Sequence, residues 1–111
     1  MIGSNALLWV PANEQLTVAK YIYGIAHGLR TLTGGSIPTA DQVKEMIAQF
    51  SSNADVGKWA TLGTSIAALW GGVYPYFGGD TKLALQYLEA LAAGLEACAA
   101  PYLQPKVVVT A

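Results

Sequence analysis

The stretch from Trp59 to Gly79, WATLGTSIAALWGGVYPYFGG, contains no charged residue and lies between Lys58 and Asp80. Its large apolar residues recur at steps of three and four, which places them on one stripe of a helix. They are Trp59, Leu62, Ile66, Leu69 and Val73. Gly63, Ala67 and Gly71 recur at steps of four on a neighbouring stripe, where a second backbone could approach closely. Because so little of this helix is polar, we expect protein or lipid to cover it.

The composition of the whole chain supports the same expectation. Hydrophobic residues make up 53% of the 111 residues and charged residues only 12%, whereas about 25% is usual for charged residues. A single domain of this length buries only somewhat more than roughly 60% of its unfolded surface. A charged surface normally keeps a free monomer soluble. The shortage of charge therefore indicates partner subunits, a membrane or self-assembly.

The charge pattern disfavours nucleic acid as a partner. Six basic and seven acidic residues give a net charge of −1. The basic residues are spread almost evenly, as Lys20, Arg30, Lys44, Lys58, Lys82 and Lys106. Strong binding to a phosphate backbone needs clustered cations. One or two phosphate contacts per subunit would still be compatible with a repeating assembly.

Local signals predict where the helices begin. Asn13 is expected to cap a first helix. Thr39 and Gln42 match a capping box, in which each side chain bonds the other residue's backbone amide at the start of a second helix. Asp80 is expected to cap the last helix. We therefore expect four helices joined by short connections.

Glycine and proline predict where the helices end. Gly71 and Gly72, followed by Pro75, are expected to stop the third helix near Trp70. Pro101 is expected to stop the fourth. The expected helices span residues 13–33, 39–51, 54–70 and 80–100. Since short connections favour antiparallel neighbours, the predicted fold is all-α, a single domain 1–111 forming a small four-helix antiparallel bundle.

Apolar segments flank the predicted bundle. The N-terminal arm, residues 1–12, contains Leu7, Leu8, Trp9 and Val10 directly before a proline. It could pack on the core of its own chain, or dock on a neighbouring subunit. The C-terminal arm, residues 101–111, carries three consecutive valines that favour a short β-strand or a docking arm.

Small residues also recur on the first and fourth predicted helices. Gly24 and Gly28 form a G-x-x-x-G pattern, and Ala90 and Gly94 have the same spacing. Each glycine costs about 1 kcal/mol in a helix interior. Close approach of another helix is the expected compensation.

An aromatic loop follows the third helix. Trp70, Tyr74, Tyr76 and Phe77 lie within eight positions and have no basic neighbours, which argues against base stacking. Two interpretations remain open at this stage. The loop could pack over one end of the bundle, or it could form a contact surface for another protein.

Few residues offer chemistry. His27 is the single histidine and Cys98 the single cysteine, so no metal site with several such ligands is expected. Glu89 and Glu96 lie seven residues apart on one face, about 10 Å by helical rise. They could be a solvated face, or a pair for acid–base work or cation binding completed by a second element. We expect no catalytic residues, no metal and no cofactor.

These patterns predict a non-enzymatic structural or assembly subunit of a larger homo- or hetero-oligomer, such as a coat, filament, ring, capsid or virion-type component. A small membrane-embedded helical protein is one alternative, because Trp59 to Gly79 is long enough to span. A soluble ligand-binding helical bundle is another. No signal peptide is recognised, so cytoplasmic synthesis is expected. The predicted interface comprises Leu8, Trp9, Val10, Gly24, Gly28, Gly63, Ala67, Gly71, Trp70, Tyr74, Tyr76, Phe77, Val107, Val108 and Val109.

Overall fold

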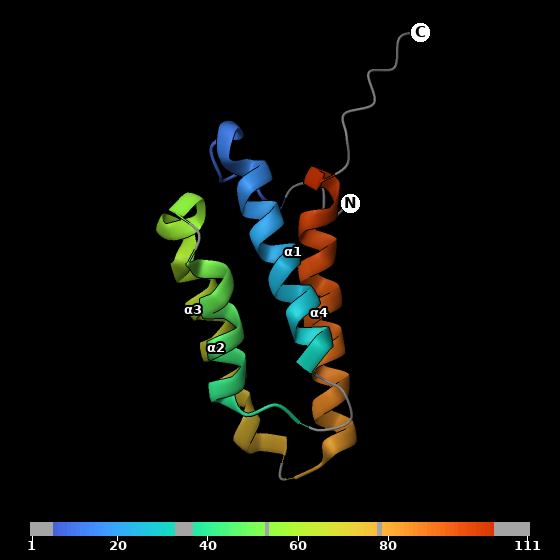
Figure 1. Cartoon of the computed structure of the whole chain (residues 1–111). Helices are drawn as coiled ribbons and strands as arrows, with labels where there is room; N and C mark the ends of the chain where they lie inside the picture. Colours follow the sequence, from blue (N-terminus) through green and yellow to red (C-terminus); the bar gives the residue numbers. More distant parts are fainter. Residues whose placement is uncertain (1–5, 33–36, 53, 78, 104–111) are drawn as a thin grey trace, which may run out of the picture.

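A computed structural model of the chain describes residues 6–32, 37–52, 54–77 and 79–103 (Figure 1). Within these ranges every regular element is a helix, and there are no strands. The α-helices are α1 (Gln15–Leu32), α2 (Ala40–Ser51), α3 (Ala60–Val73) and α4 (Thr81–Leu103). Short 3₁₀ segments are η2 (Ala12–Glu14), η3 (Ala54–Trp59) and η4 (Tyr74–Phe77). The predicted all-α fold, with four helices packed against each other, is confirmed.

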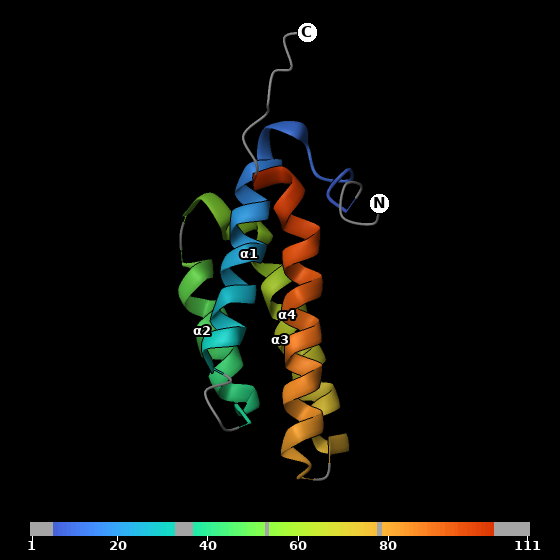
Figure 2. The same ribbon diagram turned by 90° about the vertical axis from the view of Figure 1, so that its right-hand side faces the viewer.

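The helices are arranged as two close pairs. α1 lies along α4, and α2 lies along α3, with α1 also contacting α2 (Figures 1 and 2). Fully buried alanines line the contact between α1 and α4, namely Ala19, Ala26, Ala84, Ala92 and Ala99. Their short side chains allow the two helices to approach closely. Both helices contribute buried residues to each of two hydrophobic clusters.

Trp70 on α3 is the largest fully buried side chain among the described residues. Its indole nitrogen donates a hydrogen bond to the carbonyl of Pro38 at 3.2 Å. Its ring stacks on Tyr87 of α4, with centroids 6.0 Å apart, and contacts Phe77 at 5.6 Å. Trp70 therefore joins α3, η4 and α4 at one end of the molecule.

The predicted start signals of α2 and α4 are confirmed. The Thr39 hydroxyl accepts from the Gln42 amide at 3.1 Å, and the Gln42 side chain accepts from the Thr39 amide at 2.8 Å. Asp80 accepts from the Leu83 amide at 3.0 Å. The prediction for Asn13 is wrong, because this residue lies inside the η2 turn and α1 begins after it.

The predicted bounds of the third helix are also wrong. Residues 54–59 form the η3 turn, so α3 begins at Ala60. At its other end α3 continues through Gly71 and Gly72 to Val73. Pro75 lies near the start of η4, where a helical turn does not require its missing amide. The packing of Trp70 and Tyr74 against each other accompanies this extension.

Pro101 does not end α4, which continues to Leu103. Proline removes one backbone hydrogen bond, whose acceptor would be the carbonyl of Ala97. Ala97 is exposed, so water can bond its carbonyl. The segment 104–111, with the predicted docking valines Val107, Val108 and Val109, lies outside the described residues.

Candidate interaction surfaces

The N-terminal arm packs on its own chain through only some of its side chains. Leu7 and Val10 are buried against α1 and α4. The Gln15 amide group holds them by donating to both of their carbonyls, at 3.1 and 3.2 Å. Leu8 and Trp9 point away and are 67% and 60% exposed. Val10 therefore packs on the core of its own chain and is not available for contact with a neighbouring subunit. Leu8 and Trp9 are available for such a contact.

Trp9 is held in a defined position despite its exposure. Its indole nitrogen donates to the Ala6 carbonyl at 2.8 Å, and its ring meets Trp59 edge-on with centroids 5.7 Å apart. Leu16, in the first turn of α1, is also about half exposed. We call Leu8, Trp9 and Leu16 the arm end of the molecule.

A second group of exposed apolar residues lies at the opposite end, around η4 (Figure 1). Tyr76 is 86% exposed, and Leu69, Tyr74 and Leu83 are each exposed by more than a third. We call these four residues the turn end. Of the predicted aromatic interface, Trp70 is buried and Phe77 is half-buried against it, so both serve the core of a single chain. Only Tyr74 and Tyr76 present their rings to solvent.

The glycines of α1 pack against α2 of the same chain. A Cβ atom at Gly24 would lie 3.1 Å from the Phe50 ring, and one at Gly28 would lie 2.9 Å from Cγ of Met46. Both neighbours belong to α2. The G-x-x-x-G pattern therefore permits α2 to approach α1, and these two predicted interface positions face the chain's own core.

Gly63 of α3 likewise permits close packing, against both α1 and α2. A Cβ atom there would overlap the hydroxyl of Tyr21 and the Cγ2 methyl of Ile47. Tyr21 is buried, and its hydroxyl forms a 2.6 Å hydrogen bond with Ser51. Gly63 is therefore also covered within one chain, contrary to its prediction as an interface residue.

The small residues of α4 behave differently. A Cβ atom at Gly94 would meet nothing within 4 Å. Ala90, Ala93 and Ala97 are exposed beside it, so the helix presents an outward face of small side chains. Within the described part of the chain, nothing offsets the helix-propensity cost of Gly94.

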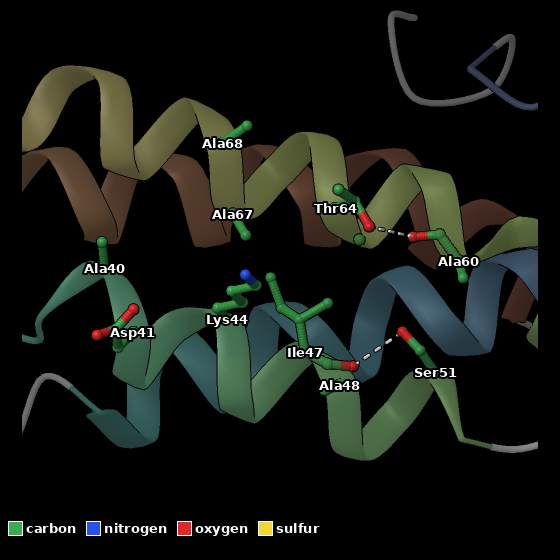
Figure 3. A pocket seen from close by; sticks show the side chains of 11 residues that line it. Ala40, Asp41, Lys44, Ile47, Ala48, Ser51, Ala60, Thr64, Ala67 and Ala68 are labelled. Atoms are coloured by element: carbon green, nitrogen blue, oxygen red, sulfur yellow. Dashed lines mark hydrogen bonds between the residues drawn. The ribbon is translucent and has the colours of Figure 1, made fainter.

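A groove of about 380 Å³ runs between α2 and α3 (Figure 3). Its walls carry small side chains at six positions, namely Ala40, Ala48, Ala60, Gly63, Ala67 and Ala68. Ala67, a predicted interface residue, is half-buried here. A Cβ atom at Gly71 would lie 3.8 Å from Cβ of Ala40, which is ordinary van der Waals contact. Lys44 and Asp41 are the charged residues that line the groove.

The two glutamates of α4 share one cation. Arg30 of α1 forms ion pairs with both Glu89 and Glu96, and its Nε donates to Glu96 at 2.6 Å. The hydrogen bonds that Arg30 donates to Glu89 first and to Glu96 second raise the pKa of Arg30 above its ordinary value. A second element, α1, therefore does complete the Glu89–Glu96 pair. The cation between the two carboxylates is the Arg30 side chain.

Arg30→Gln is expected to lower the urea midpoint of unfolding modestly. The substitution leaves Glu89 and Glu96 without their shared cation, and exposed pairs of this kind contribute little individually. The decrease should shrink in 1 M salt, where the Debye length falls to about 3 Å. Lys20→Gln, which removes an exposed charge of α1 outside the cluster, is the control. Equal midpoints for the two variants at low salt would contradict a stabilising role for the cluster.

The remaining candidates are not brought together. His27 is exposed on α1, beside a shallow hollow toward α2, and Cys98 is a half-buried free thiol on α4. In the described ranges, no three histidine, cysteine or acidic side chains are grouped as metal ligands would be. These residues do not define a reaction centre.

No protein-family model, curated protein or solved structure matches the chain.

Sequence reasoning missed part of the exposed apolar surface. Leu69 lies on the predicted apolar stripe of α3, and the predicted interface does not include Leu16, Tyr23 or Leu83. All four side chains are exposed. The spacing of Leu16 and Tyr23, seven residues apart on a helix face that also carries Lys20, was the available signal. Periodicity locates an apolar stripe, but it does not state whether a neighbouring helix reaches it.

Proposed function

We propose that the chain is a non-enzymatic structural subunit that packs into a larger homo- or hetero-oligomer, of the coat, filament, ring or virion type. The observation that carries this proposal is the pair of exposed apolar ends. The arm end offers Leu8, Trp9 and Leu16, and the turn end offers Leu69, Tyr74, Tyr76 and Leu83. Scattered exposed apolar residues are ordinary, but apolar groups rich in aromatics are typical of protein contacts.

The placement of the two ends supports repeated association. They lie at opposite ends of the molecule (Figure 1). Contact between unlike ends of successive copies is heterologous, and it generates a ring when the rotation closes or a filament when it does not. The exposed small-residue face around Gly94 adds a side surface on which another helix could pack closely. The proposal includes the finer architecture expected from the sequence, an antiparallel bundle with an apolar N-terminal arm and a β-prone C-terminal tail.

The native mass tests the proposal. In detergent-free buffer we expect the particle to be several times the 11.6 kDa of one chain by light scattering. Leu8→Glu and Tyr76→Glu are each expected to shift the mass toward the monomer, because a buried charge without a partner is costly in an interface. Both sites are exposed, so the helical content should not change.

Gln49→Glu is the matched control, since it adds the same charge to an exposed site of α2 outside both ends. A stable monomer over the whole accessible concentration range would contradict the proposal. An oligomer whose mass is unchanged in both glutamate variants would remove the two ends from the interface.

One observation favours a membrane-embedded protein as a second candidate. Of the described helices, α4 is long and apolar enough to cross a membrane, and only 22% of that stretch is buried. The stretch that the sequence offered for the membrane alternative, Trp59 to Gly79, contains α3, whose 14 residues reach only about 21 Å. A bilayer core measures about 30 Å. Recovery of the protein in the membrane fraction after a carbonate wash would favour this candidate over the assembly subunit.

A further inference from the structure

The groove between α2 and α3 combines an apolar wall with one unpaired cation. Its walls are formed mostly by alanine, glycine and Ile47, while the hydroxyls of Ser51 and Thr64 already donate to carbonyls of their own helices. Figure 3 shows the Lys44 nitrogen directed from α2 toward α3, at the level of Ala67. Among the described residues, Lys44 has neither an ion pair nor a hydrogen bond, unlike Arg30 and Lys58, which are paired with glutamates.

The volume of the groove limits the size of the molecule that it can bind. A volume of about 380 Å³ is far too small for a helix, whose diameter with side chains is about 10–12 Å. At about 30 Å³ for a water-sized group, it holds about a dozen non-hydrogen atoms. Ligand sites are typically of this size, mostly apolar and supplied with a few polar groups that orient the ligand.

We propose that this groove binds a linear aliphatic monocarboxylate of about ten carbons, with its carboxylate at Lys44 and its alkyl chain along the α2–α3 contact. Asp41 defines the direction of binding. It lies one helical turn before Lys44 on the same side of α2 and lines the same groove, so it repels the carboxylate from that end. The alkyl chain therefore runs the other way, past Ala48 toward Ala60.

The test uses sodium decanoate below its micelle concentration, added to the full chain and followed by isothermal titration calorimetry. We expect saturable binding with one decanoate per chain. Lys44→Met is expected to weaken decanoate binding roughly threefold to tenfold, while decanol binding, which needs no cation, stays unchanged. Asp41→Asn should tighten decanoate binding, because it removes a like charge. The two charge variants therefore move the affinity in opposite directions.

A blocking variant tests the alkyl position. Ala48 is exposed and lines the groove, so Ala48→Leu should fill the groove without disturbing the core and should abolish binding of both decanoate and decanol. Ala93→Leu, which adds the same side chain at an exposed alanine of α4, is the control and should bind like the unchanged chain. Far-UV circular dichroism verifies the fold of each variant.

Several results would overturn the proposal. They are the absence of saturable decanoate binding, equal weakening of decanoate and decanol by Lys44→Met, and tighter binding of decyltrimethylammonium than of decanoate. A change in native mass with Ala48→Leu, without decanoate binding to the unchanged chain, would assign the groove to a subunit contact instead. Because ligand binding does not require self-association, this proposal and the proposed assembly function can fail independently.

Discussion

Replacing Trp70 by alanine is expected to lower the free energy of unfolding by about 3–5 kcal/mol, the range found for large aromatic residues in cores. Trp70 is fully buried and contacts Tyr74, Phe77 and Tyr87. The substitution also removes the hydrogen bond to the Pro38 carbonyl. Small domains are stable by only about 5–15 kcal/mol, so this one change should remove a large part of the stability.

Urea unfolding followed by far-UV circular dichroism measures the effect. It should be repeated at several protein concentrations, because association would stabilise the folded chain by mass action. Tyr23→Ala is the control: this aromatic residue of α1 is exposed and lies outside both ends, so its loss should stay within about 0.5 kcal/mol. A loss below about 1 kcal/mol for Trp70→Ala would show that Trp70 does not join α3, η4 and α4.

The same glycine-to-alanine change should have opposite effects at Gly63 and Gly94. At Gly63 the new methyl group overlaps Tyr21 and Ile47, and overpacking of this kind costs about 1–3 kcal/mol. Displacing Tyr21 also strains its hydrogen bond to Ser51. Since alanine recovers about 1 kcal/mol of helix propensity, we expect a net loss of up to about 2 kcal/mol.

At Gly94 the methyl group enters open space, so Gly94→Ala should gain up to about 1 kcal/mol from propensity alone. Both variants can be compared in one urea titration series, with Gly28→Ala, which meets Met46, as a further packed position. Stabilisation by Gly63→Ala would contradict the close packing of α3 on α1 and α2. Destabilisation by Gly94→Ala would show that another surface already covers this face of α4.

The helix starts of α2 and α4 were predictable because capping is local. Thr39, Gln42 and Asp80 satisfy backbone amides within one turn of their own positions, and these bonds need no distant partner. The helix ends were less predictable. Packing of Trp70 against Tyr87 and Phe77 favours an extended α3. The residues around Gly71 and Gly72 do not reveal this packing, because Tyr87 lies on another helix.

Tertiary packing also decided which of the predicted interface residues are buried and which are exposed. Trp70 and Tyr76 are both aromatic and lie six positions apart, yet one is fully buried and the other is 86% exposed. Gly63 and Gly94 follow similar small-residue spacings, yet only Gly63 is packed against another helix. Spacing identified these residues as unusual, but their roles depend on which helices become neighbours.

The sequence by itself determined that the chain is helical, where two of its helices begin, and that it carries more apolar side chains than a free domain of its length usually covers. These properties depend on propensity, capping and composition, which act over a few residues or over the whole chain. The tertiary structure alone decided which glycines are buried, that Arg30 joins Glu89 and Glu96, and that Leu8, Trp9 and Tyr76 stay exposed. Those outcomes require segments far apart in the chain to meet, and the geometry of that meeting is set by side-chain packing that no local pattern encodes.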